Sequence, residues 1–143
     1  MDKDIFELVR EINATVSVCK QWAVSNIPQN GLSQARMYTL IYLRDNGSSP
    51  MRDLKNFLGT SPTNITGLVD GLEQDGFVTR VADPEDRRVT RIVITDSGKR
   101  RLKNDWQQYE ANCAQSLKGL DKLSRQKILS ALTELRLQIQ HTD

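Results

Sequence analysis

The sequence contains few of the residues that usually carry catalysis, metal binding or crosslinks. Its 143 residues include one histidine and two cysteines, and aromatic residues make up 6%. Two cysteines are too few for the disulfide framework of a small secreted domain. The single histidine, His141, lies in a polar tail, and no Cys–His pair, Ser–His–Asp grouping, phosphate-binding loop or metal-ligand spacing is apparent. We therefore expect no enzyme, no metal site and no cofactor.

Long apolar runs are also missing, and none approaches the roughly 20 residues that a membrane-spanning helix needs. The first residues, MDKDIFELVREI, are acidic and amphipathic, unlike a signal peptide. With no export signal and only two thiols, the chain is expected in the cytoplasm, with its cysteines reduced. Its length suits one domain with a core of its own.

The excess of positive over negative charge is confined to one segment. The net charge is +2, but residues 78–103 alone carry eight Lys or Arg and four Asp or Glu, whereas residues 1–77 are acidic overall. A local excess of this kind indicates a polyanionic partner better than the total charge does. A solvated basic surface would have the same composition, so a second feature of the sequence is needed before a polyanionic partner can be inferred.

Apolar residues recur at three- and four-residue steps at both ends of the chain, which predicts long amphipathic helices. The N-terminal stripe is Ile5, Leu8, Val9, Ile12, Val16, Cys19 and Ala23, and the C-terminal stripes are Leu102, Trp106, Tyr109, Cys113, Leu117 and Leu120, then Ile128, Leu132, Leu135 and Ile139. Thr95 and Ser124 are the expected N-caps of the two C-terminal helices. One chain of this size cannot easily cover three such stripes, so we expect a homodimer.

The centre of the chain repeats one short pattern after a helix expected over residues 33–43. Ser49-Pro50 and Ser61-Pro62 each begin a further helix, because serine suits the N-cap and proline the first helical position. Gly59 and Gly76 end these helices. The expected inner faces are Met51, Leu54, Phe57 and Leu58 in the first and Ile65, Leu68, Val69 and Leu72 in the second. Two short helices joined by a few residues form a helix-turn-helix candidate.

The second of these helices carries short polar side chains on its outward face and first turn. They are Ser61, Thr63, Asn64, Thr66 and Gly67, continued by Asp70 and Gly71. Hydroxyl and amide groups at the start of such a helix suit base edges and phosphates in a major groove. The same residues are also common as helix caps and as ordinary surface residues, so this pattern alone does not distinguish a DNA-reading helix from any other exposed helix.

A hairpin follows at once. Residues 77–81 and 89–94 are rich in β-branched side chains and predict paired strands, with residues 83–86 as the turn. Arg87 and Arg88 then lie exposed at the tip, where an arginine can enter a minor groove. Asp86 could hold Arg88 by a bidentate pair and fix its aim; the alternative is a solvated surface pair. A helix-turn-helix followed by this hairpin is a winged arrangement.

The run NITGLVDGLEQDGFVTRVADPEDRRVTRIVITDSGKRRL resembles the core signature of the multiple antibiotic resistance regulator (MarR) family. The matching pieces are Leu68-Val69-Asp70, Leu72-Glu73, Gly76-Phe77-Val78, Arg80, Asp83-Pro84, Asp86-Arg87-Arg88 and Thr95 with Gly98. Helix order and length also match, so the resemblance covers nearly the whole chain.

The resemblance implies a mainly α fold with a small β-hairpin wing. It also implies one domain over residues 1–143, with a winged helix-turn-helix lobe at 33–95 and dimerisation helices at 1–32 and 96–143. Family members are usually homodimeric repressors that bind a pseudo-palindromic double-stranded DNA operator. Small phenolic or lipophilic effectors, or oxidants, often relieve the repression. The second helix of the motif enters the major groove, and the wing arginine enters the minor groove.

One departure concerns Gly67 and Gly71, where many relatives carry arginine. Losing those phosphate contacts should weaken non-specific affinity. Binding would then depend on the wing and on DNA-backbone contacts from Arg52, Lys55 and Arg80.

Effector and redox sites are less sharply defined. The aromatic candidates for a pocket between the dimer helices and the lobe are Trp22, Tyr38, Tyr42 and Trp106, each of which could equally serve as core packing. Cys19 and Cys113 lie on apolar stripes and behave either as small buried hydrophobes or as a redox switch, as in some relatives.

The alternative to a DNA-binding regulator is a helical protein-interaction module that does not bind DNA. The intact wing pattern of Asp86 and Arg88 argues against this alternative.

Overall fold

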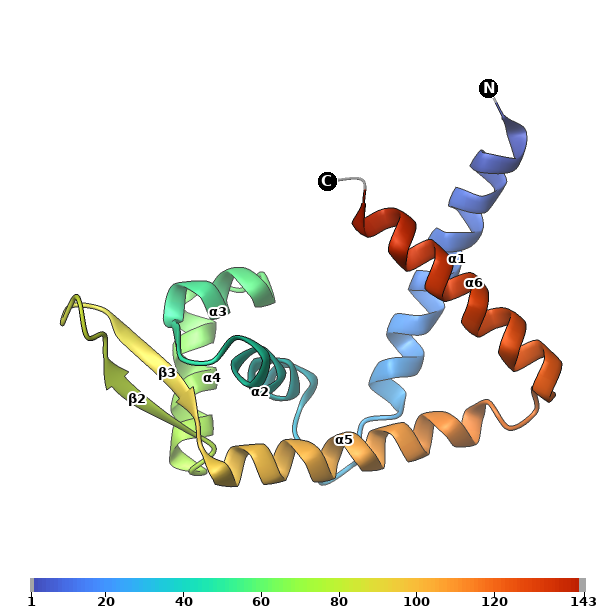
Figure 1. Cartoon of the computed structure of the whole chain (residues 1–143). Helices are drawn as coiled ribbons and strands as arrows, with labels where there is room; N and C mark the ends of the chain where they lie inside the picture. The colour runs from blue at the N-terminus through green and yellow to red at the C-terminus, as the bar shows by residue number, and fades with distance from the viewer. Residues whose placement is uncertain (1, 142–143) are drawn as a thin grey trace.

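The computed structural model describes residues 2–141, which form six helices and one three-stranded sheet. The elements are α1 (Lys3–Ser25), α2 (Gln34–Asn46), β1 (Ser49–Pro50), α3 (Met51–Leu58), α4 (Pro62–Gln74), β2 (Val78–Ala82), β3 (Thr90–Ile94), α5 (Asp96–Ser116) and α6 (Lys122–Gln140). Figure 1 shows a lobe built from α2, α3, α4 and the sheet, from which α5 runs out toward a separate pair of helices, α1 and α6. We call α1 and α6 the arms. The mainly α fold class with a small hairpin is confirmed.

Three of the expected helix starts are confirmed by their caps. In each, a side-chain oxygen accepts a hydrogen bond from the backbone N–H three residues later, as an N-cap should. The pairs are Ser33 with Arg36, Ser61 with Asn64, and Thr95 with Gly98, at 3.3, 3.1 and 3.0 Å. These caps are read correctly from sequence because they depend on residues only three positions apart.

Two other expected caps are wrong. Ser49 is buried, pairs with Ile92 as part of β1, and donates its hydroxyl to the carbonyl of Gly47 at 2.9 Å. Pro50 therefore occupies the cap position of α3 without a side-chain hydrogen bond. At the last helix, Asp121 is the cap of α6, and the expected cap, Ser124, donates its N–H to that carboxylate at 2.7 Å. A carboxylate also matches the positive end of the helix dipole.

The lobe holds a single buried cluster among the described residues. It consists of Leu32, Met37, Leu40, Leu43, Leu54, Ile65, Val69, Leu72, Val78, Ile92 and Leu102. The expected inner faces of α3 and α4 are confirmed with one exception. Phe57 is 51% exposed and lies against the ring of Tyr42, with centroids 4.7 Å apart.

The sheet has the strand order β1-β3-β2, and both pairings are antiparallel. The hairpin strands match the expected ranges to within a residue. Their register runs from Val78 opposite Ile94 to Ala82 opposite Thr90, so residues 83–89 project beyond the sheet as the wing. The two-residue strand β1 was not expected, because such a short segment carries no alternation that a sequence can show.

Side chains of α5 bind the connection between α1 and α2. The Asp105 carboxylate accepts the backbone N–H of Leu32 at 2.6 Å and the Arg101 guanidinium at 3.0 Å. Farther along the helix, the amide of Asn112 donates to the carbonyl of Asn26 at 2.9 Å. One helix therefore continues from the lobe to the arms and is hydrogen-bonded to the connection along the way.

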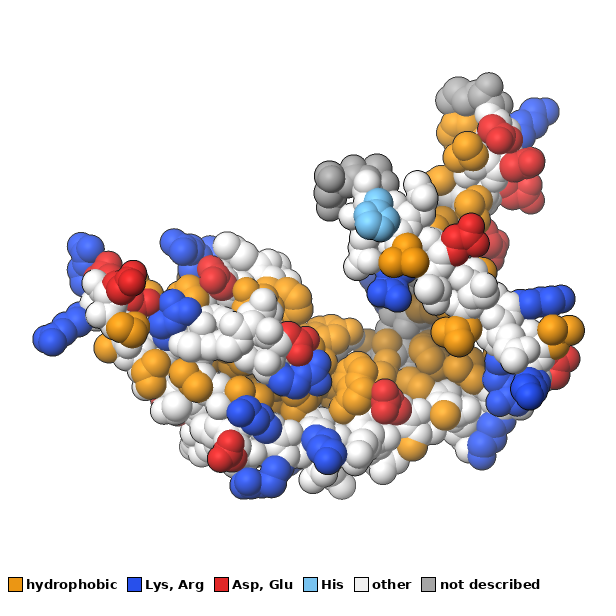
Figure 2. All heavy atoms as spheres, viewed as in Figure 1, with side chains coloured by type: hydrophobic (Ala, Val, Ile, Leu, Met, Phe, Trp, Pro, Cys, Tyr) orange, Lys and Arg blue, Asp and Glu red, His pale blue; other side chains and the backbone are white. Residues whose placement is uncertain are grey.

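The arms contain no buried residue in the single chain. Large apolar side chains there are instead strongly exposed, including Ile5, Leu8, Leu129, Leu132 and Ile139 at 57, 55, 68, 55 and 58%. Figure 2 shows such side chains spread over the arms. The accessible surface is 10590 Å², whereas a compact monomer of this mass would expose about 7,500 Å². The predicted stripes of the arms exist, and one chain alone does not cover them. The stripe of α5 is different: Leu102 and Cys113 are buried and Trp106 and Tyr109 half-buried within the single chain, so the expectation that this stripe needs a partner is wrong.

A close approach at the start of α5 provides a test of this packing. A Cβ at Gly98 would lie 2.2 Å from the backbone oxygen of Phe77, which already accepts the N–H of Thr95 at 3.0 Å. We expect Gly98→Ala to lower the free energy of unfolding by roughly 1–3 kcal/mol, because backbone has to move.

Gly67→Ala is the matched control, because α4 leaves nothing within 4 Å of its added methyl. That variant should be neutral or more stable by up to about 1 kcal/mol, since alanine favours the helix. Denaturant unfolding of the two variants measures the difference. Equal stabilities would contradict the packing at Gly98.

Candidate nucleic-acid interface

The first half of α4 presents an open polar surface. Ser61, Thr63, Asn64, Thr66 and Gly67 are all exposed. Nothing lies within 4 Å of a Cβ built on Gly67, so the helix backbone itself is accessible there. Thr66 donates its hydroxyl to the carbonyl of Pro62 at 2.9 Å, which leaves its methyl group and oxygen lone pairs for an outside partner. The five candidate residues therefore share one accessible surface.

The second half of α4 is different, and the expectation that Gly71 lies open on the outward face is wrong. A guanidinium nitrogen of Arg36 lies 3.0 Å from the position that a Cβ at Gly71 would take. The same arginine, from α2, donates to the Asp75 carboxylate at 2.7 Å. Because Gly71 has no side chain, the guanidinium of Arg36 from α2 fits against it. Arg36 lies 35 residues before Gly71 in the sequence, so this contact could not be predicted from a local pattern.

Arg80 is held by two carboxylates of α4 and is not a free cation. Its guanidinium donates to Glu73 at 2.6 Å and to Asp70 at 2.5 Å, and its backbone N–H donates to the other oxygen of Glu73 at 3.1 Å. The hydrogen bond to Asp70 is the main reason why the pKa of Arg80 is raised, with Glu73 adding to it. Arg80 therefore ties β2 to α4, and the expectation that it contacts the DNA backbone gains no support from this geometry.

The other two candidates for backbone contacts lie on α3. The Arg52 side chain is 78% exposed, with only a loose 3.7 Å approach to Asp53. Lys55 is half-buried. Arg52 is thus the more available of the two for a phosphate.

The wing presents Arg88 as expected. Its side chain is 90% exposed, and its guanidinium donates to both oxygens of Asp86, at 3.0 and 3.1 Å. Asp86 also accepts the backbone N–H of Arg88 at 3.0 Å. These bonds, that of the side chain first, lower the pKa of Asp86. The predicted bidentate pair is present, and Arg87 beside it is exposed as well.

The turn itself begins later than the predicted residues 83–86. The N–H of Val89 donates to the carbonyl of Asp86 at 2.9 Å, which closes a four-residue turn over 86–89. Asp83 instead uses its side chain, which accepts the N–H groups of Glu85 and Asp86 at 2.9 and 3.1 Å. The predicted turn was centred on Pro84, and the two backbone N–H groups that the Asp83 carboxylate accepts were not predicted.

The basic excess of residues 78–103 is divided between two places. Figure 2 shows Lys and Arg side chains at the left end, where Figure 1 places the wing tip. Lys99, Arg100 and Lys103 are also exposed, but they belong to the start of α5, at the lower edge of the lobe away from the wing tip. Only part of the positive charge therefore lies with the wing.

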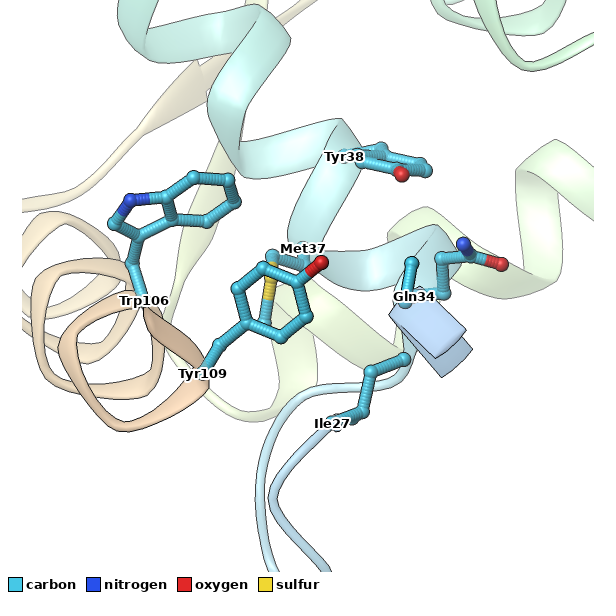
Figure 3. A pocket seen from close by; sticks show the side chains of 7 residues that line it. Ile27, Gln34, Met37, Tyr38, Trp106 and Tyr109 are labelled. Carbon is cyan, nitrogen blue, oxygen red and sulfur yellow. The ribbon is translucent and has the colours of Figure 1, made fainter. Parts of the chain in front are cut away.

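A small cavity lies between α2 and α5. Its volume is about 40 Å³, and it is lined by Ala23, Ile27, Gln34, Met37, Tyr38, Trp106 and Tyr109 (Figure 3). An engineered cavity that holds benzene measures about 150 Å³, so this one is too small for an aromatic ligand as it stands.

Two of the four expected pocket residues line this cavity and two do not. Tyr38 and Trp106 lie in it, whereas Tyr42 packs on Phe57 and Trp22 is not among the lining side chains. Sequence reasoning missed Tyr109, although it follows Trp106 by three residues on the same stripe. Burial, and then a hydrogen bond with Cys113, raise the pKa of Tyr109 to about 12.

The two cysteines have different surroundings. Cys113 is buried, which fits the reading of a small hydrophobe, while Cys19 is exposed on α1 of the single chain. Within residues 2–141, no group of three His, Cys, Asp or Glu side chains could hold a metal ion. Each helix within the same residues is either too short or too polar to span a lipid bilayer.

Comparison with known proteins gives consistent results. Residues 32–90 match the model of the MarR family. The Bacillus subtilis (strain 168) protein named uncharacterized HTH-type transcriptional regulator YfiV is 30% identical over 104 residues, which cover 73% of this chain and 65% of YfiV. The HTH-type transcriptional repressor YetL of the same organism is 43% identical over 75 residues, covering 50% of this chain and 44% of YetL. The matched region thus spans less than two thirds of these relatives.

A solved structure shows the same fold. Bordetella bronchiseptica BpsR, whose DNA binding is regulated by 6-hydroxynicotinic acid, superposes with a TM-score of 0.65 at 21% identity. The match covers 88% of this chain and 98% of BpsR.

Proposed function

Because the chain belongs to the MarR family of helix-turn-helix transcriptional regulators, we propose that it binds a pseudo-palindromic DNA operator as a homodimer and represses the adjacent genes. The observation that carries this proposal is the wing, where a 90% exposed arginine is held in one direction by the carboxylate two residues before it. An exposed, oriented guanidinium has no role in the core and suits the negative potential of a narrow minor groove.

The open half of α4 supplies the second contact. Its exposed hydroxyl and amide groups, from Thr63, Asn64 and Thr66, can reach base edges in the major groove. The bare backbone at Gly67 lets the helix approach closely. Helix and wing together would read the major groove and the neighbouring minor groove of one half-site, as winged helix-turn-helix proteins do.

The arms would form the dimer interface. Their exposed apolar stripes and the excess surface of the single chain are what a second copy would cover. We assign residues 33–95 to DNA reading and residues 1–32 and 96–143 to dimerisation. A two-fold dimer then requires half-sites about one helical turn, or 10 bp, apart.

Repression and its relief are supported by the relatives. YetL is named as a repressor, and the DNA binding of BpsR responds to an aromatic acid. We propose a small aromatic or lipophilic effector for this chain, entering beside Tyr38 and Trp106, where the cavity would have to widen. The relatives are transcriptional regulators and give no indication of an enzyme. A regulator of genomic DNA would act in the cytoplasm.

The proposal predicts a specific salt dependence. Arg52, Lys55 and Arg87 are the candidates for phosphate contacts, so a dimer makes about six, and log K should fall with log salt with a slope of about −5. Anisotropy titrations of a labelled duplex at several salt concentrations measure that slope.

The duplex is first selected by the wild-type protein from a random-sequence library. Arg52→Ala should reduce the slope by about 2, since two protomers each lose one contact. Arg100→Ala, an exposed arginine at the start of α5, is the matched control and should leave it unchanged. A library without enriched sequences, or binding that is insensitive to salt, would overturn the proposed function.

A further inference from the structure

Arg91 makes a set of contacts that the DNA-reading surface described above does not account for. It lies on β3, opposite Val81 of β2 and Pro50 of β1. Its Nε donates to the hydroxyl of Ser48 at 2.9 Å, and a terminal nitrogen donates to the Ser48 carbonyl. The other terminal nitrogen donates to the Asp83 carboxylate at 3.0 Å. One side chain thus joins the connection before β1 to the base of the wing.

Asp83, at the other end of this contact, organises the wing turn. The carboxylate oxygen that Arg91 leaves free accepts the N–H groups of Glu85 and Asp86. The Asp83 N–H donates to the carbonyl of Val89 at 2.9 Å, across the base of the wing. Its side chain is only 15% exposed. The bonds from Glu85 and then Arg91 lower the pKa of Asp83, which therefore stays charged beside the guanidinium.

These contacts form a continuous series from the lobe to the exposed arginine. Ser48 precedes Ser49, which is buried and paired with β3, so it is fixed to the lobe. From Ser48 the series passes through Arg91 and Asp83 to the backbone of Asp86, whose carboxylate holds Arg88.

The base of the hairpin is anchored by Arg80, which ties β2 to α4, and by Val78 and Ile92 in the core cluster. Arg91 adds a second attachment, on the side of β1 and one residue pair nearer the wing turn. A two-stranded hairpin is marginal by itself, and the third strand β1 has only two residues. The residue of β1 opposite Arg91 is Pro50, which has no N–H to donate to a ladder. The guanidinium supplies side-chain hydrogen bonds where the backbone ladder ends. A planar group with donors in three directions can do this, whereas a lysine ammonium is a single point charge.

We propose that Arg91 is a positioning residue that fixes the direction of the wing against the lobe, and so aims Arg88 at the minor groove while α4 occupies the major groove. This inference rests on the proposed DNA binding. Arg91 acts through Arg88 and does not touch DNA: its side chain is 30% exposed, and all three of its nitrogens are already engaged.

A double-mutant cycle tests the proposal, with the duplex that the wild-type protein selects from a random library as the probe. Arg91→Lys keeps the charge and removes the three-way contact. We expect it to weaken binding on the order of tenfold in the wild-type background. In an Arg88→Ala background the same change should cost less than about twofold, because the aimed group is already gone.

Two further measurements separate aiming from other roles. Thermal melts of Arg91→Lys and wild type should agree closely, since the contact lies outside the core cluster. The slope of log K against log salt should be the same for wild type and for Arg91→Gln, which removes the charge, because Arg91 does not contact phosphate. Arg100→Lys is the matched control and should bind like wild type.

The outcomes that would overturn the inference are distinct. Wild-type affinity of Arg91→Lys, or an equal loss with and without Arg88, would reject the aiming role while leaving DNA binding intact. A slope reduced by about 2 in Arg91→Gln, which removes the charge, would instead make Arg91 a phosphate contact. A library without an enriched duplex would reject the proposed function and the positioning role together.

Discussion

Arg88→Ala is expected to fold like the wild type and to bind the selected operator roughly 5- to 150-fold more weakly per half-site, the range for one well-placed base contact. The Arg88 side chain is 90% exposed, and within residues 2–141 its hydrogen bonds go only to Asp86. Its removal therefore leaves the core cluster untouched. In a dimer the two half-sites nearly double the loss in free energy. A thermal melt beside an operator titration measures both properties.

Neighbouring variants make the result specific. Asp86→Ala should cost less, because it removes the carboxylate that orients Arg88 and leaves the arginine itself. Arg87→Ala, at an equally exposed position, should weaken binding to all sequences alike and reduce the salt slope. A folded Arg88→Ala protein that binds operator as tightly as the wild type would refute the role of the wing.

Leu132→Glu is expected to dissociate the dimer and, with it, to abolish tight operator binding. Leu132 is 55% exposed in the single chain and lies on the apolar stripe of α6. In a dimer interface the new carboxylate would be buried without a partner, which costs several kcal/mol. One lobe on its own retains a single half-site and loses the gain from simultaneous binding. Light scattering at micromolar concentration measures the mass.

Ser130→Glu is the matched control on the same helix. At 100° per residue, Ser130 lies about 160° around α6 from Leu132 and is also exposed. It should stay dimeric and bind normally. A Leu132→Glu protein that remains dimeric would show that α6 is not part of the interface, and a wild-type monomer would remove the pairing altogether.

What the sequence could predict depended on how far apart the interacting residues lie. The caps at Ser33, Ser61 and Thr95 and the pair of Asp86 with Arg88 are local, and each is found as expected. Ser49 illustrates the limit, since its role in β1 is decided by a strand more than 40 residues later. No pattern within a short window contains that information.

The arginines show the same limit in the candidate site. Arg80 and Arg91 are both half-buried arginines, and they lie on the neighbouring strands β2 and β3. From the sequence, Arg80 was predicted to contact the DNA backbone, whereas no role was predicted for Arg91. Their partners, Asp70 and Glu73 for Arg80 and Ser48 for Arg91, distinguish them. The first of these pairings could have been suspected, because Asp70 and Glu73 lie one turn apart on α4.

The length of α5 has a mechanical consequence. With 21 residues it measures about 31 Å, and it begins in the lobe and ends beside the arms. If it moves as a rigid lever, a rotation of about 5° at the arms shifts the lobe end by roughly 2.7 Å, close to the 3.4 Å rise of one base pair. In the proposed symmetric dimer both lobes would move, so the distance between them would change by up to about 5.4 Å, roughly one and a half base-pair steps. In the proposed dimer, a molecule that binds only at the arms would therefore change the spacing of the two lobes, so that they no longer match the two half-sites of the operator.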